Sequence, residues 1–576
     1  MHDIVFRGAS IVDGTGRPPF TGDVAIDGER IAAVGGKAGP GRREVAAEGL
    51  LLTPGWVDVH THYDGQATWD SMLAPSSWHG TTTILMGNCG VGFAPCRPRD
   101  HAALIDLMEG VEDIPGIALA EGLEWDWETF PEFLSALERR KRTIDIGTQM
   151  PHHPLRVYVM GERALRHEAA TPEDIAVMRK LTEEGLRAGA FGFTTSRTEL
   201  HKTMTGAHVP GYFAKTEELL GIAEAIKTTG IGAFGMLSDF ADEAEEFSWL
   251  RDLARETQRP VWFLLTDRLN DPQRWRRLLN GVRAAKADGL PVSAQIAGRP
   301  VGLILGLQTS LTPFTAKATF ASLAKLDPKE RLAKLRDPAI RRAILAEGLS
   351  DTLLDIMQPQ HRHTATRWDR LYVLGDPPDY EPGAESSIMA LAAKAGQSPA
   401  EFAYDYLTGA NGERLLYFPV TNYVTGDHEP LRAMLTEPGT VVGLGDGGAH
   451  CGVICDASVP TFMLTHWARD RHRGERLPLE WVIKRQTQDT AAFFGFTDRG
   501  TIAPGLRADL NLIDYAGLRL HAPELAYDLP AGGRRLIQYV DGYRMTTVAG
   551  TPVFENGEHT GALPGRLVRS GTAGPR

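Results

Sequence analysis

His60 and His62 are the residues of this chain whose types and spacing most directly suggest chemistry. They flank Thr61 at the end of an apolar run, and alternate residues of an extended strand point to the same side, where both imidazoles could hold one metal ion. Spacing alone leaves an alternative open, which is a pair of polar histidines in a loop. The context favours a metal, because a glycine-flanked aspartate, Asp446, ends another apolar run far along the chain.

Eight short apolar runs alternate with helical segments through the middle of the chain. Such an alternation is typical of a parallel sheet with outer helices, and eight repeats predict an α/β fold with a (β/α)8 barrel of the TIM type. One intervening helix has a recognisable start, where Thr171 precedes Pro172 and Asp174 in a capping-box arrangement. The runs are GWVDVHTH, TTTILMGNCG, TIDIGTQMPHH, GAFGFTT, IGAFGMLS, PVWFLLTD, PVSAQIAG and TVVGLGDGGAH.

The segments on either side of these runs have a different sequence pattern. Residues 1–53 and 491–576 alternate short β-branched runs with Gly, Pro and Asp turns, which is typical of antiparallel strands. We therefore expect one small β-sandwich built from both termini, with the barrel occupying residues 54–490. The gap at about residues 300–438 is too long for one helix and predicts an insertion over the active site.

Several of these segments resemble motifs of a known family. PGWVDVHTHYDGQATWD is similar to the first-strand motif of the amidohydrolase superfamily, and MGNCGVGFAP to the second-strand motif of its D-aminoacylase (N-acyl-D-amino-acid deacylase) group. VVGLGDGG resembles the eighth-strand motif, and GTIAPGLRADLNLID resembles the returning sandwich strands. The resemblance covers nearly the whole chain.

The resemblance implies a metal site made by His60, His62, the thiolate of Cys89 and the carboxylate of Asp446, with Asp446 as general acid and base. Zinc with such ligands makes water nucleophilic at neutral pH, and Asp446 could carry the proton to the leaving nitrogen. A small buried apolar role is the commoner fate of a free cysteine, but flanking glycines at a strand end favour a ligand at Cys89. The thiolate favours zinc over other metals.

The sequence departs from the family at two expected ligands. The fifth and sixth strands of the relatives each end in a histidine ligand, whereas here the nearest positions hold Met236 and Leu265. Asp239 and Asp267 lie a few residues further on and could substitute, although a solvated or capping aspartate suits both positions better. We therefore expect one tightly bound zinc ion and leave a second open.

Further polar residues follow the apolar runs where barrel loops gather. Arg197 and Arg299 could pair with a substrate carboxylate. The other residues are spare candidates for ligation or substrate binding, and each could equally be a surface, salt-bridged or core side chain: His152, His153, His201, Lys202 and His450. Cys451 and Cys455 have a spacing that would share one helix face, but two small core residues explain it equally well.

Composition limits the partners. With 61 basic and 73 acidic residues, the formal net charge of −12 gives no electrostatic basis for binding nucleic acid or an anionic membrane. No run approaches the roughly 18 apolar residues of a membrane span, and the first residues lack a secretory signal. Four cysteines are too few for a disulfide framework. We expect a cytoplasmic enzyme with a small-molecule amide substrate, which could form a homo-oligomer.

Three functions remain open on the sequence alone. The joint presence of HTH, GNCG and GDGG favours hydrolysis of a linear amide, such as an N-acyl (D-)amino acid. The missing histidines and the long insertion would suit a different carbon–nitrogen bond, in a cyclic amide, carbamate or aryl amide. A catalytically silent scaffold is the third possibility, but retention of both histidines, the cysteine and the aspartate argues against it.

Overall fold

The computed structural model describes residues 1–358 and 361–571, and its centre is built from parallel strands. The strands pair in chain order within two sheets, and only Gln149 separates the last strand of the first sheet from the first strand of the second. All eight apolar runs therefore contribute to parallel pairing, which confirms the α/β class. The first sheet holds β6 (Trp56–Asp58), β7 (Thr81–Met86) and β8 (Asp145–Thr148); the second holds β9 (Met150–Pro151), β10 (Gly192–Arg197), β11 (Ala233–Ser238), β12 (Val261–Leu264), β13 (Val292–Ala297) and β17 (Thr440–Leu444).

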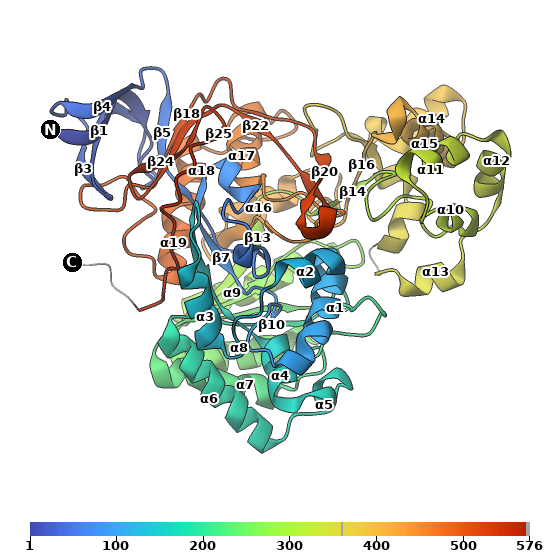
Figure 1. Ribbon diagram of the computed structural model, residues 1–576, viewed down its shortest axis with the longest axis horizontal. Coiled ribbons are helices and arrows are strands. Elements are labelled where there is room, and N and C mark those ends of the chain that lie inside the picture. Colours follow the sequence, from blue (N-terminus) through green and yellow to red (C-terminus); the bar gives the residue numbers. More distant parts are fainter. Residues whose placement is uncertain (359–360, 572–576) are drawn as a thin grey trace.

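Helices connect these strands and cover them (Figure 1). The predicted capping box is present, since the Thr171 side chain accepts from the Asp174 backbone N–H and the Asp174 carboxylate accepts from that of Thr171. Strand β7 is buried at all six positions, as expected of a strand packed on both faces. The connecting helices are α1 (His101–Glu112), α2 (Gly116–Gly122), α3 (Phe130–Arg139), α4 (His152–Met160), α5 (Glu162–Leu165), α6 (Pro172–Ala188), α7 (Thr216–Thr229), α8 (Glu243–Thr257) and α9 (Arg274–Ala287).

Both ends of the chain enter one nine-stranded sheet, in the order β25-β24-β23-β18-β5-β1-β2-β3 with β4 paired to β1. The junction is the antiparallel pair of β5 and β18, with Leu52 opposite Leu512. The N-terminal and C-terminal segments thus pack together beside the parallel strands (Figure 1). The strands are β1 (His2–Ile11), β2 (Phe20–Asp27), β3 (Arg30–Val34), β4 (Gly41–Ala46), β5 (Leu51–Pro54), β18 (Leu510–Ile513), β23 (Tyr543–Val548), β24 (Thr551–Glu555) and β25 (Glu558–His559).

The long segment between β13 and β17 forms a lobe with a core of its own, seen at the right of Figure 1. Leu303, Phe314, Leu335 and Leu407 are among its buried residues, and Val453 and Ile454 join them from beyond β17. The lobe consists of a small antiparallel sheet, β14 (Gly302–Leu305), β16 (Leu416–Pro419) and β15 (Tyr372–Val373), and of helices α10 (Ala318–Ser322), α11 (Pro328–Leu335), α12 (Pro338–Ala346), α13 (Asp351–Ile356), α14 (Ile388–Ala395) and α15 (Pro399–Thr408).

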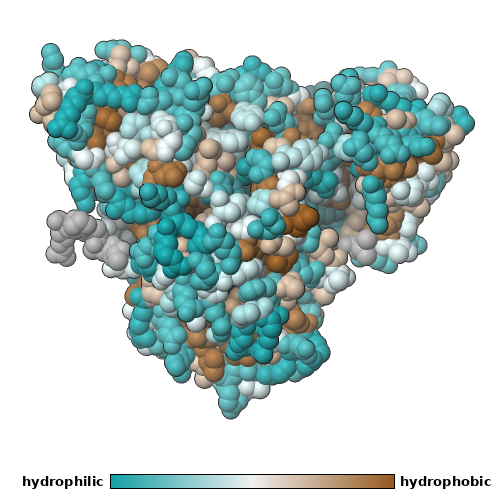
Figure 2. Space-filling view, in the orientation of Figure 1, coloured by the Kyte–Doolittle hydropathy of each residue, from teal (hydrophilic) through white to brown (hydrophobic). Residues whose placement is uncertain are grey.

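The chain returns to β17 through α16 (Glu429–Thr436) and continues into α17 (Val459–Phe462), the π-helix η8 (Met463–Asp470), α18 (Leu479–Arg485) and α19 (Gln488–Phe494). Two short antiparallel pairs precede the final strands, β19 (Arg519–Leu520) with β22 (Val540–Asp541) and β20 (Glu524–Leu529) with β21 (Gly533–Ile537). Apolar side chains on the face shown in Figure 2 occur singly or in small groups. Every helix in residues 1–358 and 361–571 is too short or too polar to cross a bilayer.

Candidate metal centre

The carboxyl ends of β6, β7 and β17 bring His60, His62, Cys89 and Asp446 into one place. One ligand atom each from His60, His62 and Cys89 lies within 4.8 Å of the others, and all three residues are buried. Cys89 Sγ is 3.5 Å from His60 Nε2, and His62 Nε2 is 3.3 Å from Asp446 Oδ1. The histidines lie just past the last paired residue of β6 instead of within the strand.

The backbone at the site adopts conformations that are uncommon for residues other than glycine. Cys89, Asp446 and His450 have φ angles of 53°, 50° and 47°. Each costs on the order of 1–3 kcal/mol, and such strain concentrates at functional sites. Gly445 is required for a different reason, because a Cβ atom there would lie 2.0 Å from the Asp58 carboxylate. That carboxylate accepts a hydrogen bond from the His60 backbone N–H.

A glutamine fixes the tautomer of His60. His60 Nδ1 lies 2.5 Å from Gln295 Oε1, which can only accept, so Nδ1 carries the proton and donates it. The other ring nitrogen, Nε2, is then a bare lone pair that faces Cys89 Sγ. An outer hydrogen bond of this kind orients the histidine ligands of metal sites.

Buried polar atoms around His62 that lack hydrogen-bond partners are suited to bind a cation. Within the described residues, His62 Nδ1, Asp446 Oδ1 and Glu112 Oε2 are buried without a hydrogen-bond partner. Glu112 Oε1 lies 3.4 Å from His62 Nδ1, and Glu112 Oε2 lies 3.5 Å from His450 Nε2. A buried polar atom without a partner costs about 1–3 kcal/mol. Two imidazoles, a thiol and carboxylates with vacant lone pairs are a donor set that suits zinc.

Burial and neighbouring charges shift the pKa values of these groups. Burial raises the pKa of the Cys89 thiol to about 11 and lowers that of His60 to about 4. Burial also lowers the pKa of His62, but Glu112 and Asp446 raise it by more, so the pKa of His62 lies well above its ordinary value. For Asp446, burial raises the pKa while His62 lowers it more, so the carboxyl stays ionised. A dication bound here would take the place of these protons.

The positions of the missing histidine ligands are apolar. Met236 lies in β11 and Leu265 follows β12, and both are buried. Neither neighbouring aspartate lines the pocket around the cluster. Asp239 forms a 2.7 Å ion pair with Arg268, and Asp267 accepts a hydrogen bond from the Val424 backbone N–H.

The structure does not place His152 or His153, the spare candidates for a ligand or an oxyanion donor, in the lining of the pocket. Both are fully buried outside the residues that line the pocket. His152 bonds to Thr195 and to Glu218, at 2.8 and 3.0 Å, and His153 bonds to Ser196 at 2.9 Å. Their side chains fill the layer between α4 and β10 and have a structural role.

The two arginines expected to bind a substrate carboxylate are also placed elsewhere. Arg197 pairs with both oxygens of Glu246 at 2.7 Å. Arg299 is buried, pairs with Asp456 at 2.8 Å and lies over the Tyr380 ring at 4.0 Å. Neither arginine lines the pocket around the cluster, and each guanidinium pairs with a carboxylate that is 49 or 157 residues away in the sequence.

Other candidates divide between the pocket and the core. His450 and His201 line the pocket; His201 Nδ1 lies 3.0 Å from Ser196 Oγ, and burial lowers the pKa of His201 to about 3. Lys202 is 3.7 Å from Glu199, outside the lining. Cys451 lies in a turn and Cys455 in an irregular segment, so the two do not share a helix face, and both are buried in the core, which was the other explanation of their spacing.

The pocket beside the cluster is a cavity of about 110 Å³ with one polar end. Its polar end is the metal-ligand cluster itself. Glu112, Arg268 and His361 also line the pocket, and the sequence analysis did not identify them. Gln295 was also missed, although a single amide in the apolar run PVSAQIAG was a visible signal. The apolar wall comes from the carboxyl ends of parallel strands, from the segments that follow them and from the insertion lobe: Leu200, Leu237, Leu264, Val301, Leu303, Val420, Val453 and Ile454.

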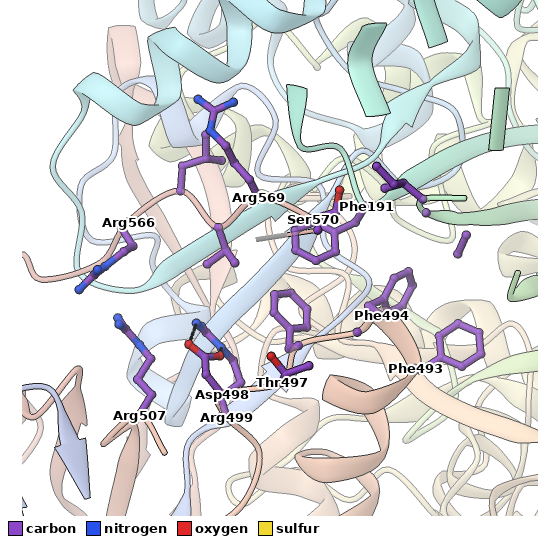
Figure 3. Close-up of a pocket in the computed structure, with 18 of the residues that line it drawn as sticks. Phe191, Phe493, Phe494, Thr497, Asp498, Arg499, Arg507, Arg566, Arg569 and Ser570 are labelled. Carbon is purple, nitrogen blue, oxygen red and sulfur yellow. Dashed lines mark hydrogen bonds and ion pairs between the residues drawn. The ribbon is translucent and has the colours of Figure 1, made fainter. Parts of the chain in front are cut away.

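A larger cavity of about 630 Å³ lies at the opposite, amino ends of β10, β11 and β12. Figure 3 shows Arg499 and Arg507 on one side of it and Phe493 and Phe494 on the other. Arg499 and Arg507 are already paired with Asp145, at 2.7 and 3.0 Å. Since ligands of parallel α/β sheets bind at the carboxyl ends of the strands, the smaller pocket is the candidate active site.

Comparison with known proteins identifies the family. The sequence matches the amidohydrolase family over residues 43–554. N-acyl-D-aspartate deacylase of Alcaligenes xylosoxydans xylosoxydans is 28% identical, over 100% of this chain and 96% of the relative. A D-aminoacylase structure with a binuclear metal centre superposes with a TM-score of 0.64 at 24% identity, covering 99% and 100% of the two chains. An N-acyl-D-glutamate deacylase of Bordetella bronchiseptica, complexed with zinc and a phosphonate inhibitor, gives 0.64 at 22% identity, covering 99% of both.

The fold and the cluster of metal-ligating side chains therefore belong to a hydrolase that acts on carbon–nitrogen bonds other than peptide bonds. The chain is a member of the amidohydrolase family, and its predicted resemblance to the D-aminoacylase group is confirmed.

Proposed function

We propose that this protein hydrolyses the linear amide bond of an N-acyl amino acid, and in particular of an N-acyl D-amino acid, with one zinc ion in its active site. The observation that carries the proposal is the buried cluster of His60, His62 and Cys89, whose ligand atoms lie within 4.8 Å of one another, with Asp446 beside it. The similarity to an N-acyl-D-aspartate deacylase supports the choice of an N-acyl substrate. We also infer that the two parallel sheets close into one barrel and that the nine-stranded sheet is the small sandwich domain.

His60, His62 and Cys89 would hold the zinc, with Asp446 and the carboxylate of Glu112 within reach. Zinc supplies Lewis acidity, which activates water for attack at neutral pH and polarises the scissile carbonyl. The donors present are enough to hold one ion. A second ion in the active site would need histidines at the positions that Met236 and Leu265 occupy. In the similar D-aminoacylase with a binuclear centre, one metal activates and the second attenuates, which supports a single-metal enzyme here.

Asp446 would move the proton. Its pKa lies below the ordinary value, so the carboxylate is ionised and can accept a proton from the attacking water. Donation of that proton to the departing nitrogen completes the cleavage and regenerates the carboxylate. The strained backbone at Asp446 holds the side chain at the cluster.

Arg268 is the permanent cation that lines the pocket and is the best candidate to receive the substrate carboxylate. Its present partner, Asp239, is a quarter exposed, so the pair can loosen to admit a ligand. The apolar wall made by Leu237, Leu264 and the insertion lobe suits an acyl chain or an apolar side chain.

The proposal is tested by release of free amino acid from a panel of N-acyl D- and L-amino acids, N-acyl amines and cyclic amides, using protein of measured zinc content. Preferred cleavage of N-acyl D-amino acids by protein with one zinc at the Cys89 cluster is expected. Turnover confined to cyclic amides would show that the proposed substrate class is wrong. Absence of turnover across the whole panel would favour a catalytically silent scaffold protein.

A further inference from the structure

A second group of metal-ligating side chains lies outside the candidate active site. Glu381, His428 and His466 each offer a ligand atom within 4.8 Å of the other two, and His60, His62 and Cys89 form the other such group found in residues 1–358 and 361–571. None of Glu381, His428 and His466 lines the pocket beside Cys89. We propose that this group, here called the Glu381 cluster, is a second zinc site.

The spacing of the three donor atoms matches a tetrahedral ion. His428 Nδ1 is 3.0 Å from His466 Nε2, His466 Nε2 is 3.2 Å from Glu381 Oε2, and His428 Nδ1 is 3.6 Å from the same oxygen. Zinc binds histidine nitrogen and carboxylate oxygen at 2.0–2.2 Å, so two tetrahedral ligands lie about 3.3 Å apart. The three observed distances bracket that value.

The protonation pattern of His428 directs a bare nitrogen into the cluster. His428 Nε2 lies 3.0 Å from the Tyr380 carbonyl oxygen, which can only accept, so Nε2 carries the proton and Nδ1 has a free lone pair. Histidine ligands of metals usually donate their second nitrogen to a carbonyl or carboxylate in this way.

The Glu381 carboxylate is held in place by hydrogen bonds from Arg471 and from the His428 backbone. Arg471 Nε lies 3.1 Å from Glu381 Oε2, Arg471 Nη2 lies 3.0 Å from Glu381 Oε1, and the His428 backbone N–H donates to Oε1 at 2.8 Å. Each oxygen has a second lone pair, so Glu381 Oε2 can ligate an ion while Arg471 orients it.

The position in the fold indicates what the ion would do. Glu381 lies in the loop between β15 and α14, His428 immediately precedes α16, and His466 lies in the π-helix η8 after β17. A π-helix often marks a functional position. The ion would join two segments of the insertion lobe, at Glu381 and at His428, to the π-helix η8, which follows β17 in the chain. His466 has a side chain 14% exposed, so water can reach the fourth position.

A hydrogen-bond network without metal is the competing interpretation, with His466 Nε2–H donating to His428 Nδ1. X-ray diffraction from crystals of the zinc-loaded protein, measured on both sides of the zinc absorption edge, separates the two. An anomalous peak between Glu381 Oε2, His428 Nδ1 and His466 Nε2, in addition to one at Cys89, is expected. Anomalous density at Cys89 alone would overturn the proposal without affecting the proposed hydrolase.

Zinc content of variants gives a second, independent readout. Relative to wild type, His466→Gln should lose one equivalent of zinc and retain the Cys89-bound ion. His472→Gln, an exposed histidine six residues later, is the matched control and should keep the wild-type content. Chelation should lower the Tm of wild type more than that of His466→Gln. Unchanged zinc content in a folded His466→Gln protein would refute the site, and the diffraction result decides if that variant does not fold.

Discussion

The backbone N–H of Asp446 donates a 2.9 Å hydrogen bond to the carbonyl oxygen of His60. The end of β17 is thereby fastened to the end of β6, two strands that lie at opposite ends of the parallel series. The proposed proton carrier and a proposed zinc ligand are placed relative to each other by backbone atoms. Replacement of either side chain should therefore leave the other in position, which makes single substitutions informative.

Asp446→Asn should lower turnover by about 10²- to 10⁴-fold, the usual contribution of general acid-base catalysis, while zinc remains bound. Asparagine keeps the shape and one oxygen but cannot carry a proton. Activity on the preferred N-acyl amino acid and zinc content by mass spectrometry would be measured on the same sample. Near-normal turnover in a zinc-loaded variant would remove Asp446 from the mechanism and weaken the assignment as a hydrolase.

Zinc at the Cys89 cluster should depend on the first-strand histidines and not on the fifth strand. His60→Ala and His62→Ala should each abolish zinc at this cluster, because each removes one of the three buried donors that hold the ion. Met236→Ala should cost about 2–5 kcal/mol of unfolding free energy through its cavity but keep the zinc. Anomalous diffraction at the Cys89 position would distinguish the variants. A folded Met236→Ala protein that had lost this ion would show that β11 contributes to the site.

Gln295→Met should weaken zinc binding at the Cys89 cluster by about 10- to 100-fold, the usual effect of removing an outer partner of a metal ligand. Methionine cannot accept the His60 Nδ1 proton strongly, so the tautomer with a bare Nε2 is no longer fixed. Competition with a chelator of known affinity would measure the change. Ser293→Ala on the same strand is the control, and equal affinities in the two variants would contradict the role of Gln295.

The parts of the site that could be predicted from sequence are those in which neighbouring residues carry the information. His60, His62, Cys89 and Asp446 each sit in a short motif at the end of an apolar run, and parallel pairing of the runs brings their ends together. The capping box at Thr171 was predicted for the same reason, since all its members lie within four residues.

The remaining site residues depend on contacts that are distant in sequence. Arg197 and Arg299 were expected in the active site because they follow strands, but their partners, Glu246 and Asp456, are 49 and 157 residues away. Glu112 stands at the end of α1 with no motif around it. Contacts between residues far apart in the sequence decide which side chains reach the pocket. A local sequence pattern carries no information about these contacts.

Arg268→Met should raise KM for N-acyl amino acids by about 10- to 100-fold, because a charge-assisted hydrogen bond to a carboxylate contributes about 1.5–3 kcal/mol. kcat should change little, since the contact is made in both ground and transition states. An N-acyl amine, which lacks the carboxylate, serves as the control substrate and should be processed equally by both proteins. A parallel loss on both substrates would mean that Arg268 supports the loop and does not bind the carboxylate.

Asp267→Asn should stabilise the protein increasingly as the pH rises, and it should leave zinc bound. Burial raises the pKa of Asp267 above its ordinary value of 3.8. A carboxyl with a raised pKa in the folded state favours folding when protonated, below the ordinary pKa, and this contribution is lost as the pH rises through the folded value. Asparagine cannot ionise and keeps an oxygen that can accept the Val424 N–H, so it avoids that loss.

Urea unfolding of wild type and Asp267→Asn at pH 4.5 and pH 7.5 measures the effect, and the advantage of the variant should be larger at pH 7.5. Zinc content measured on the same samples separates this role from ligation. If Asp267 replaced the missing sixth-strand histidine as a zinc ligand, asparagine would reduce both zinc content and stability at the higher pH. A gain in stability with full zinc content would instead show that Asp267 is a buried structural carboxyl, and that its ionisation costs free energy in the folded protein.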